Sequence, residues 1–137
     1  MSIETKVEDW LLLAQFCHTH RSFSDVLMDQ IAMRRAQAAL LCRVFAQEGI
    51  TQSELADQLA VQGATVTNMV QRMEETGLVT RRRDPRDNRL VRVYLTEEGR
   101  NKEHAIVEQF IHGEEMLFAG FTPEEHAASR CMLHRIL

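Results

Sequence analysis

The stretch from Thr51 to Leu95 constrains the fold most, because it combines helix, turn and strand signals in one order. Thr51 can cap a helix over residues 52–59, and Glu54, three residues further on, completes a capping box. After a short turn, residues 64–76 carry apolar side chains at helical spacing. The stretch therefore begins with two helices in close succession.

A small antiparallel sheet is predicted after the second of these helices. Residues 78–81 have the composition of one strand, and polar and apolar side chains alternate from Leu90 to Leu95. Residues 84–88, Asp-Pro-Arg-Asp-Asn, are typical of a turn. Residues 81–92 contain six Arg and two Asp, a net charge of +4, whereas the whole chain carries −4. A basic loop on an acidic protein predicts a local contact with a phosphate backbone.

Helices with apolar faces are expected before this stretch. About residues 3–30 predict one long helix, although Ser22 and Ser24 could cap a separate helix and divide it. A further helix is expected over about residues 34–47. Four apolar residues from Trp10 to Leu13 are consecutive, so they cover more than one side of the first helix. A lone helix does not need so wide an apolar face, which indicates burial against a partner subunit.

Two more helices are expected at the C-terminal end, over about residues 97–118 and 123–137, with Thr96 and Thr122 as their caps. We therefore predict a mostly α fold with a small β-wing. It is a winged helix-turn-helix flanked by N- and C-terminal dimerisation helices.

The chain is expected to form one domain over residues 1–137, since its 45% hydrophobic residues suffice for a real core. Residues 34–95 would form the winged helix-turn-helix, and residues 3–32 and 96–137 the helices that pair two copies. Such a protein reads double-stranded DNA by placing one helix in the major groove.

Other classes of function have little support in the sequence. No apolar run is long enough to cross a membrane, and residues 1–5 lack the pattern of a signal peptide, which predicts a cytoplasmic protein with no membrane partner. Known catalytic and phosphate-binding motifs do not occur, so we expect no enzyme activity and no cofactor. The His residues include no pair at i, i+4 spacing, which argues against a metal site. Three Cys without a CxxC pair predict buried, reduced thiols.

Several motifs resemble those of the MarR family of bacterial transcription regulators. Residues 51–56, Thr-Gln-Ser-Glu-Leu-Ala, are similar to its T-x-x-E-L-A first helix, and residues 65–79 to its recognition helix. Residues 84–89 match its wing signature, D-x-R-x-x-R, and residues 95–99 its L-T-x-x-G entry to the next helix. The likeness covers nearly the whole chain. It implies the same order of elements, a homodimer, and an effector that is a small phenolic or other lipophilic anion.

Two features depart from the family pattern. Arg34 and Arg35 stand near the usual Thr or Ser cap of the second helix, which leaves the start of that helix open. The peroxide-sensing branch of the family holds an N-terminal Cys with Tyr side chains. Cys17 is near that position, but the single Tyr of the chain is Tyr94 in the wing. A thiol-redox sensor, like a metal-responsive sensor, therefore remains an alternative with the same fold.

The DNA contacts are expected from the recognition helix and the wing. The N-terminal half of the helix is small and polar, which suits a groove, and its dipole favours phosphate. We expect Thr65 and Asn68 near base edges, since Asn can pair with adenine, and Arg86 in the minor groove. The remaining candidates for phosphate or secondary base contacts are Gln62, Thr67, Gln71, Arg72, Arg81, Arg82, Arg83 and Arg89.

Structural roles stay open for three of these residues. Arg89 could brace the wing loop through Asp84, and Arg72 could pair with an Asp of the wing. Asn68 could contact backbone or water instead of a base.

An apolar, aromatic cleft between the first, second and fifth helices is the expected effector site. Its candidate lining residues are Trp10, Phe16, Phe23 and Phe110, each of which could equally belong to the dimer interface. We thus expect a homodimeric, sequence-specific DNA-binding regulator of a pseudo-palindromic operator, more often a repressor than an activator. A small-molecule-binding protein without a DNA function is the alternative.

Overall fold

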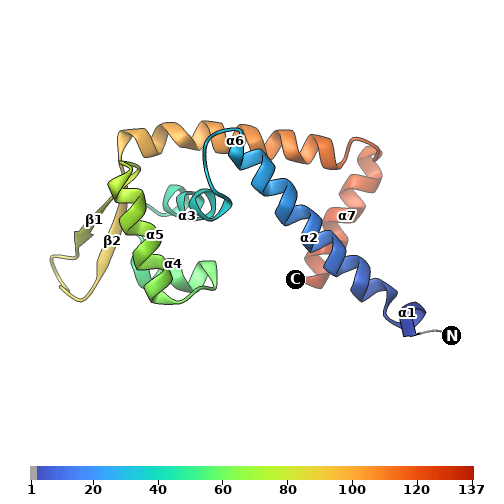
Figure 1. The fold of residues 1–137 in the computed structure, drawn as a ribbon, viewed down its shortest axis with the longest axis horizontal. Coiled ribbons are helices and arrows are strands. Elements are labelled where there is room, and N and C mark those ends of the chain that lie inside the picture. The colour runs from blue at the N-terminus through green and yellow to red at the C-terminus, as the bar shows by residue number, and fades with distance from the viewer. Residues whose placement is uncertain (1–2) are drawn as a thin grey trace.

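The computed structural model describes residues 3–137, so Met1 and Ser2 of the predicted domain lie outside the described residues. Figure 1 shows an elongated molecule in which α6 runs from the winged end to an end built of helices. The elements in chain order are α1 (Ile3–Lys6), α2 (Glu8–Asp29), α3 (Arg35–Ala46), α4 (Gln52–Leu59), α5 (Gly63–Glu75), β1 (Val79–Arg83), β2 (Val91–Leu95), α6 (Glu97–Leu117) and α7 (Pro123–Ile136). The predicted mostly α fold with a small β-wing is confirmed.

The helix-turn-helix is formed by α4 and α5. The Thr51 hydroxyl accepts a hydrogen bond from the backbone N–H of Glu54 (3.1 Å), and the Glu54 carboxylate accepts one from the backbone N–H of Thr51 (2.9 Å). The predicted capping box is therefore present. Ala60 ends α4 in the left-handed conformation (φ 54°), and Gly77 follows α5 with φ 80°. Left-handed residues of this kind end helices because they turn the chain away from the helix axis.

The wing is a hairpin that leads directly into α6. The antiparallel register runs from Val79 opposite Leu95 to Arg83 opposite Val91. The Thr96 hydroxyl then accepts a hydrogen bond from the backbone N–H of Gly99 (3.0 Å), as expected of a helix cap. A Cβ at Gly99 would lie 2.0 Å from the carbonyl oxygen of Leu78, so only glycine allows α6 to start this close to the wing.

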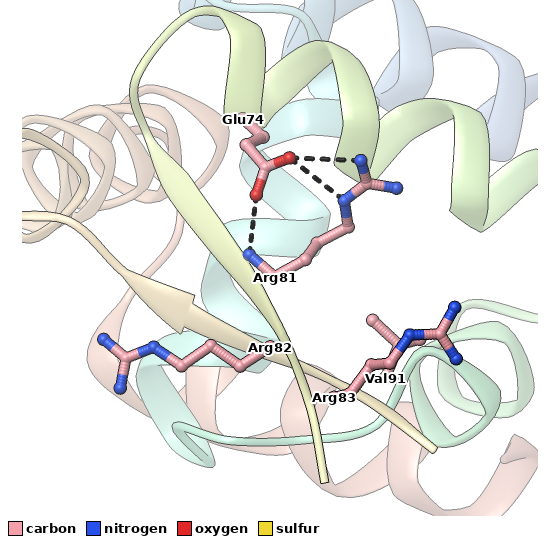
Figure 2. A pocket seen from close by; sticks show the side chains of 5 residues that line it. All are labelled: Glu74, Arg81, Arg82, Arg83 and Val91. Carbon is pink, nitrogen blue, oxygen red and sulfur yellow. Dashed lines mark hydrogen bonds and ion pairs between the residues drawn. The ribbon is translucent and has the colours of Figure 1, made fainter. Parts of the chain in front are cut away.

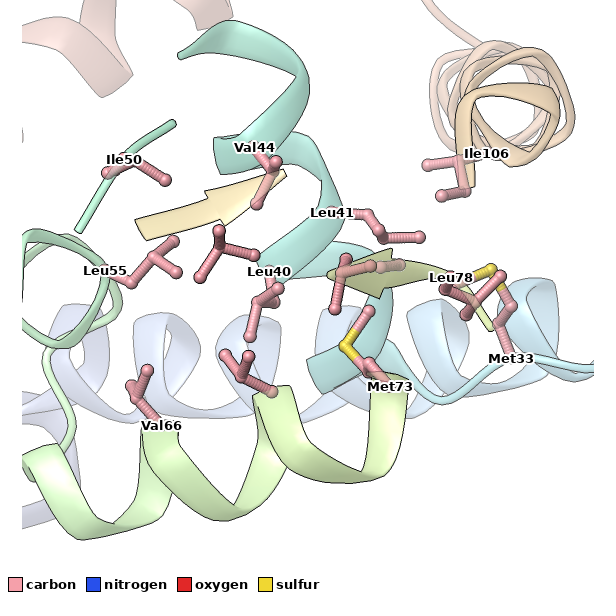
Figure 3. Packing of buried hydrophobic residues seen from close by; sticks show 14 of the residues in the cluster. Met33, Leu40, Leu41, Val44, Ile50, Leu55, Val66, Met73, Leu78 and Ile106 are labelled. Carbon is pink, nitrogen blue, oxygen red and sulfur yellow. The ribbon is translucent and has the colours of Figure 1, made fainter. Parts of the chain in front are cut away.

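The hydrophobic core lies inside the winged part and extends to its contact with α6. Figure 3 shows side chains from α3, α4 and α5 converging, with Ile106 of α6 at one edge. Burying one such side chain contributes about 1.5–3 kcal/mol. The fully buried side chains of this core include Leu40, Leu41, Val44, Ile50, Leu55, Val66, Val70, Met73, Val79, Val93 and Ile106.

The N-terminal helix is continuous where the sequence left a break open. Ser24 lies inside α2, where its hydroxyl donates to the carbonyl of His20 (2.8 Å) instead of capping a helix. The interruption falls at Val7, between α1 and α2. The start of α3 is also settled, because Arg34 is its cap residue and its backbone N–H donates to the side chain of Gln37 (2.9 Å). Arginine has no side-chain acceptor, so the half of a capping box that a Thr or Ser hydroxyl would make is missing, and the half made by Gln37 is present.

The far end of the molecule consists of α2, α7 and the last turns of α6. Gly113 of α6 lies against Leu27 of α2, where a Cβ would come within 2.6 Å of the Leu27 side chain. Along α7 every described residue is exposed or partly exposed. Large apolar side chains are exposed on all three helices, including Trp10 (74%), Phe110 (47%) and Met132 (60%). None of the described helices has the length and apolar character needed to span a membrane.

Candidate nucleic-acid interface

The exposed face of α5 is polar over its N-terminal half. Val66, Val70 and Met73 point into the core, and the turns between them leave the opposite face to solvent. Thr67 is engaged within the protein, since its hydroxyl donates to the carbonyl of Gly63 (3.0 Å) and lies 3.3 Å from the Gln52 side chain. The predicted contact residues on this face are all exposed: Gln62, Thr65, Thr67, Asn68, Gln71 and Arg72.

The arginines of β1 differ in what they contact. Figure 2 shows Arg81 turned toward Glu74 of α5, whereas Arg82 and Arg83 extend to opposite sides of the strand. The Glu74 carboxylate accepts from the backbone N–H (2.8 Å) and guanidinium (3.1 Å) of Arg81. These contacts lower the pKa of the Glu74 carboxyl. The backbone hydrogen bond from Arg81 has the largest effect, and the guanidinium has a smaller one. Arg81 thereby ties the recognition helix to the wing, so its charge is already matched inside the protein.

The other basic side chains are more open to solvent. The guanidinium of Arg82 lies 4.8 Å from the centre of the Tyr94 ring, a cation–π contact. Arg83 donates to the carbonyl of Asn88 (2.8 Å), which holds the two sides of the wing loop together. Arg86 is exposed at the turn. The exposed arginines Arg82, Arg83 and Arg86 therefore give the wing a positive charge. Figure 1 shows the wing next to α5.

The brace of the wing is Arg92, which corrects the predicted role of Arg89. Arg89 pairs with Asp87 (3.1 Å) and is exposed, so it does not reach Asp84. Asp84 is buried and accepts hydrogen bonds from Arg92 (2.6 Å) and from the backbone N–H groups of Arg86 (2.7 Å) and Asp87 (3.3 Å). The Arg92 guanidinium beside it holds the pKa of the Asp84 carboxyl below its usual range, helped by those N–H groups.

Arg92 also connects the wing to the helix-turn-helix. Its guanidinium donates to the carbonyl of Gly49 (2.8 Å), two residues before Thr51. The backbones of Thr51 and Arg92 also pair in an isolated antiparallel β-bridge. One side chain thus links the wing turn to the entry of α4. The sequence offered one signal for this role, because a charged residue interrupts an otherwise apolar run, but it identified no partner for it.

A second ion pair joins the same region to α6. Arg100 donates to both carboxylate oxygens of Glu48 (2.5 and 2.7 Å). This hydrogen bonding is the main cause of the lowered pKa of the Glu48 carboxyl. Glu48 precedes α4, so this pair connects the long helix to the helix-turn-helix.

The predicted effector residues divide among three places. Phe23 and Phe110 line one cavity of about 370 Å³ between α2 and α6. Phe16 lines a second cavity of about 480 Å³ that α7 completes, and Trp10 lies beside the α1–α2 junction. The lining residues of the first cavity come from α2, from α6 and from Phe118 directly after α6. The helix α3, which was expected as the third wall, does not contribute to the lining.

The cysteines and histidines do not form a metal centre among the described residues. Cys17 and Cys131 are exposed, so the prediction of three buried thiols is wrong for two of them. Helix faces that look apolar in the sequence are open to solvent in one copy of the chain. Cys42 is half-buried, and burial raises the pKa of its thiol.

The second helix of the helix-turn-helix, α5, has a polar exposed face and lies beside a basic hairpin. These two features define a DNA-binding winged helix-turn-helix protein. The sequence profile described as the MarR family matches residues 33–91. The HTH-type transcriptional regulator YsmB of Bacillus subtilis, itself uncharacterised, is 33% identical over 104 residues, which cover 74% of this chain and 69% of the regulator. The solved structure titled "Crystal Structure of MarR" has a TM-score of 0.79 and 30% identity, and covers 91% of each chain.

The chain belongs to the MarR family. It is therefore a DNA-binding transcriptional regulator and not an enzyme. The organic hydroperoxide resistance transcriptional regulator of Bacillus subtilis is 36% identical over 73 residues, 53% of this chain. The aligned residues make up 50% of the relative's length, so the similarity is limited to about half of each protein.

Proposed function

We propose that the protein is a homodimeric repressor that binds a pseudo-palindromic operator and releases it when a small effector binds. The observation that carries the proposal is the polar, exposed face of α5 beside the basic wing. A helix of this kind fits the major groove, where each base pair presents a distinct pattern of donors and acceptors. A protein bound across an operator excludes other proteins from it, which favours repression over activation.

Each contact follows from the position of its side chain. Asn68 and Thr65 face outward from the first turns of α5 and would meet base edges. Arg86 at the wing turn would enter the minor groove, where narrow A·T-rich stretches attract arginine. Arg82, Arg83 and Arg89 would meet phosphates. Arg81 is held by Glu74, so its contribution to phosphate binding would be smaller.

The homodimer is supported by the exposed apolar side chains at the far end. Leu12, Leu133 and Ile136 are 56%, 42% and 64% exposed in one copy. A second copy would cover them and set the distance between two recognition helices, which read half-sites about 34 Å apart. An effector bound between α2 and α6 would change that distance through the Arg100–Glu48 pair.

The alternatives raised by the sequence have weaker support. Cys17 is exposed on α2, while Tyr94, the single tyrosine, lies on β2 beside Arg82. His104 and His126 pair with glutamates of their own chain. A thiol or metal sensor would need partners other than these.

The test is a titration of fluorescently labelled upstream DNA against random DNA of equal length. We expect preference for the upstream DNA, and an affinity that falls about 10³-fold or more from 50 to 200 mM salt. Asn68→Ala should lower the preference by about tenfold, and Arg86→Ala should weaken binding as well. Arg130→Ala, an exposed arginine on α7, is the matched control. Equal affinity for both DNAs would refute the proposed operator recognition.

A further inference from the structure

The cavity between α2 and α6 is lined by aromatic rings and by a close contact between the two helices. Gly113 of α6 permits that close contact beside Leu27 of α2. The rings of Phe23, Phe110 and Phe118 are among its lining groups. A volume of about 370 Å³ is in the range that small ligands occupy. The complete lining is His20, Phe23, Ser24, Leu27, Phe110, Gly113, Glu114, Leu117 and Phe118.

The titratable groups among the described lining residues are one carboxylate, that of Glu114, and one imidazole, that of His20. None of the described residues that line the cavity is a lysine or an arginine. The hydroxyl of Ser24 donates to the carbonyl of His20, so it is already used within α2. An anion in this cavity would lose part of its hydration and meet a carboxylate, with no cationic arginine or lysine to pair with it.

Glu114 is held at the cavity by α7. Its carboxylate oxygen lies 3.3 Å from Nε2 of His126, and the imidazole of His126 stacks on the ring of Phe118 at 3.9 Å. Phe121 meets the same Phe118 ring edge-on at 5.2 Å. The carboxylate is 56% exposed, so it retains oxygen lone pairs for a ligand. A carboxylate next to three phenyl rings provides both an ion pair and cation–π contacts for one positive charge.

We propose that this cavity binds small lipophilic cations, aryl-alkyl ammonium compounds, and not the phenolic or other anions that the family resemblance implies. The inference rests on the proposed function, because it names the class of effector that controls DNA release. The argument comes from charge complementarity between the cavity and an ammonium group. A helix of a second copy is the competing occupant, and the test separates the two.

The experiment uses three probes with one phenyl-ethyl frame: phenethylammonium, 2-phenylethanol and 3-phenylpropionate. Isothermal titration calorimetry of the protein measures the affinity of each probe. We expect the ammonium to bind best and the carboxylate worst. Glu114→Gln should weaken phenethylammonium about two- to fivefold and leave the neutral alcohol unchanged. Glu114→Lys should reverse the order of the cation and the anion.

Glu108→Gln is the matched control. Glu108 lies on the same helix and also faces a histidine, His104, at 3.0 Å, but it does not line the cavity. Its replacement should leave all three affinities unchanged. The proposal is overturned if the carboxylate binds as tightly as the ammonium, if Glu114→Gln has no effect, or if no probe binds because a second copy fills the cavity.

DNA release is measured separately, by fluorescence anisotropy of operator DNA at saturating phenethylammonium. If phenethylammonium releases the DNA and Glu114→Gln reduces that release, both the charge class of the effector and the proposed function are supported. Charge-selective binding without any effect on DNA supports the cavity's preference and overturns its role as the effector site. Release by the anion alone would overturn the charge class and leave the proposed function standing.

Discussion

The winged part and the terminal helices use apolar side chains in opposite ways. In residues 34–95, Leu40, Leu55 and Val70 are fully buried within one copy of the chain. In α2 and α7, Trp10 and Met132 remain 74% and 60% exposed. The core of the winged part, with Met28 of α2 and Ile106 of α6 added to it, is therefore complete within one copy of the chain, whereas the apolar faces of the far end stay open to solvent.

This difference indicates that the winged part positions the DNA-facing residues and that the far end is suited to self-association. Apolar area that is left in water contributes nothing to folding until a second surface covers it, at about 25 cal/mol per Å². The winged part can hold its DNA-facing residues in place without a partner. If a second copy covers the far end, as proposed above, the stability of that end depends on protein concentration.

The largest expected effect is in the core of the winged part. Leu40→Ala should lower the free energy of unfolding by about 2–5 kcal/mol, because it leaves a cavity among packed side chains. Urea unfolding followed by circular dichroism measures this loss. Leu12→Ala removes the same atoms from a side chain that is 56% exposed. At low protein concentration it should cost only about 0.5 kcal/mol or less. Equal costs at that concentration would contradict the comparison.

The second prediction concerns the far end. Leu133→Glu places a charge in the apolar cavity that α2, α6 and α7 line, so it should weaken self-association at least about tenfold. Sedimentation velocity over a range of concentrations measures the change. Gln58→Glu adds the same charge on an exposed face of α4 and should leave self-association unchanged. A Leu133→Glu protein that remains as associated as the wild type would place the interface elsewhere.

Local signals explain why most of the fold was predictable. Thr51 and Glu54 form a capping box through contacts three residues apart, and Thr96 and Thr122 cap their helices in the same short-range way. The predicted bounds of α4, residues 52–59, agree with the structure. Alternation along residues 90–95 predicted β2 to within one residue.

Features that depend on distant partners could not be predicted in the same way. Arg92 reaches Gly49, 43 residues away, and the sequence gives no sign of that distance. The sequence suggested that Arg89 could brace the wing loop through Asp84. Instead, Arg89 pairs with the neighbouring Asp87, and Arg92 pairs with Asp84. Cys17 lies on an apolar helix face, which suggested burial, but the surface that would cover it is absent from a single chain. Asn68 and Arg86 lie where expected, and their contacts with DNA remain predictions.

The smallest expected effect lies in the wing and tests whether its order is internal to one chain. Asp84→Asn removes the charge that Arg92 contacts and should lower stability modestly at pH 7. The folded-state pKa of Asp84 is depressed, so its stabilising contribution is present above the ordinary aspartate pKa of about 3.9. It is lost as the pH falls through the lower folded-state pKa. The difference between wild type and Asp84→Asn should therefore stay constant from about pH 7 to pH 5 and shrink below about pH 4.

Chemical unfolding at several pH values measures that difference, and repeating it at two protein concentrations connects it to the comparison. Because Asp84, Arg92 and Gly49 belong to one chain, the difference should not change with concentration, in contrast to the effect of Leu133→Glu. Arg92→Ala removes the partner instead, and the pH dependence of the remaining Asp84 should flatten because its main stabilising contact is gone. A wing difference that grows with protein concentration would mean that a second copy orders the wing, and the winged part would no longer be self-contained.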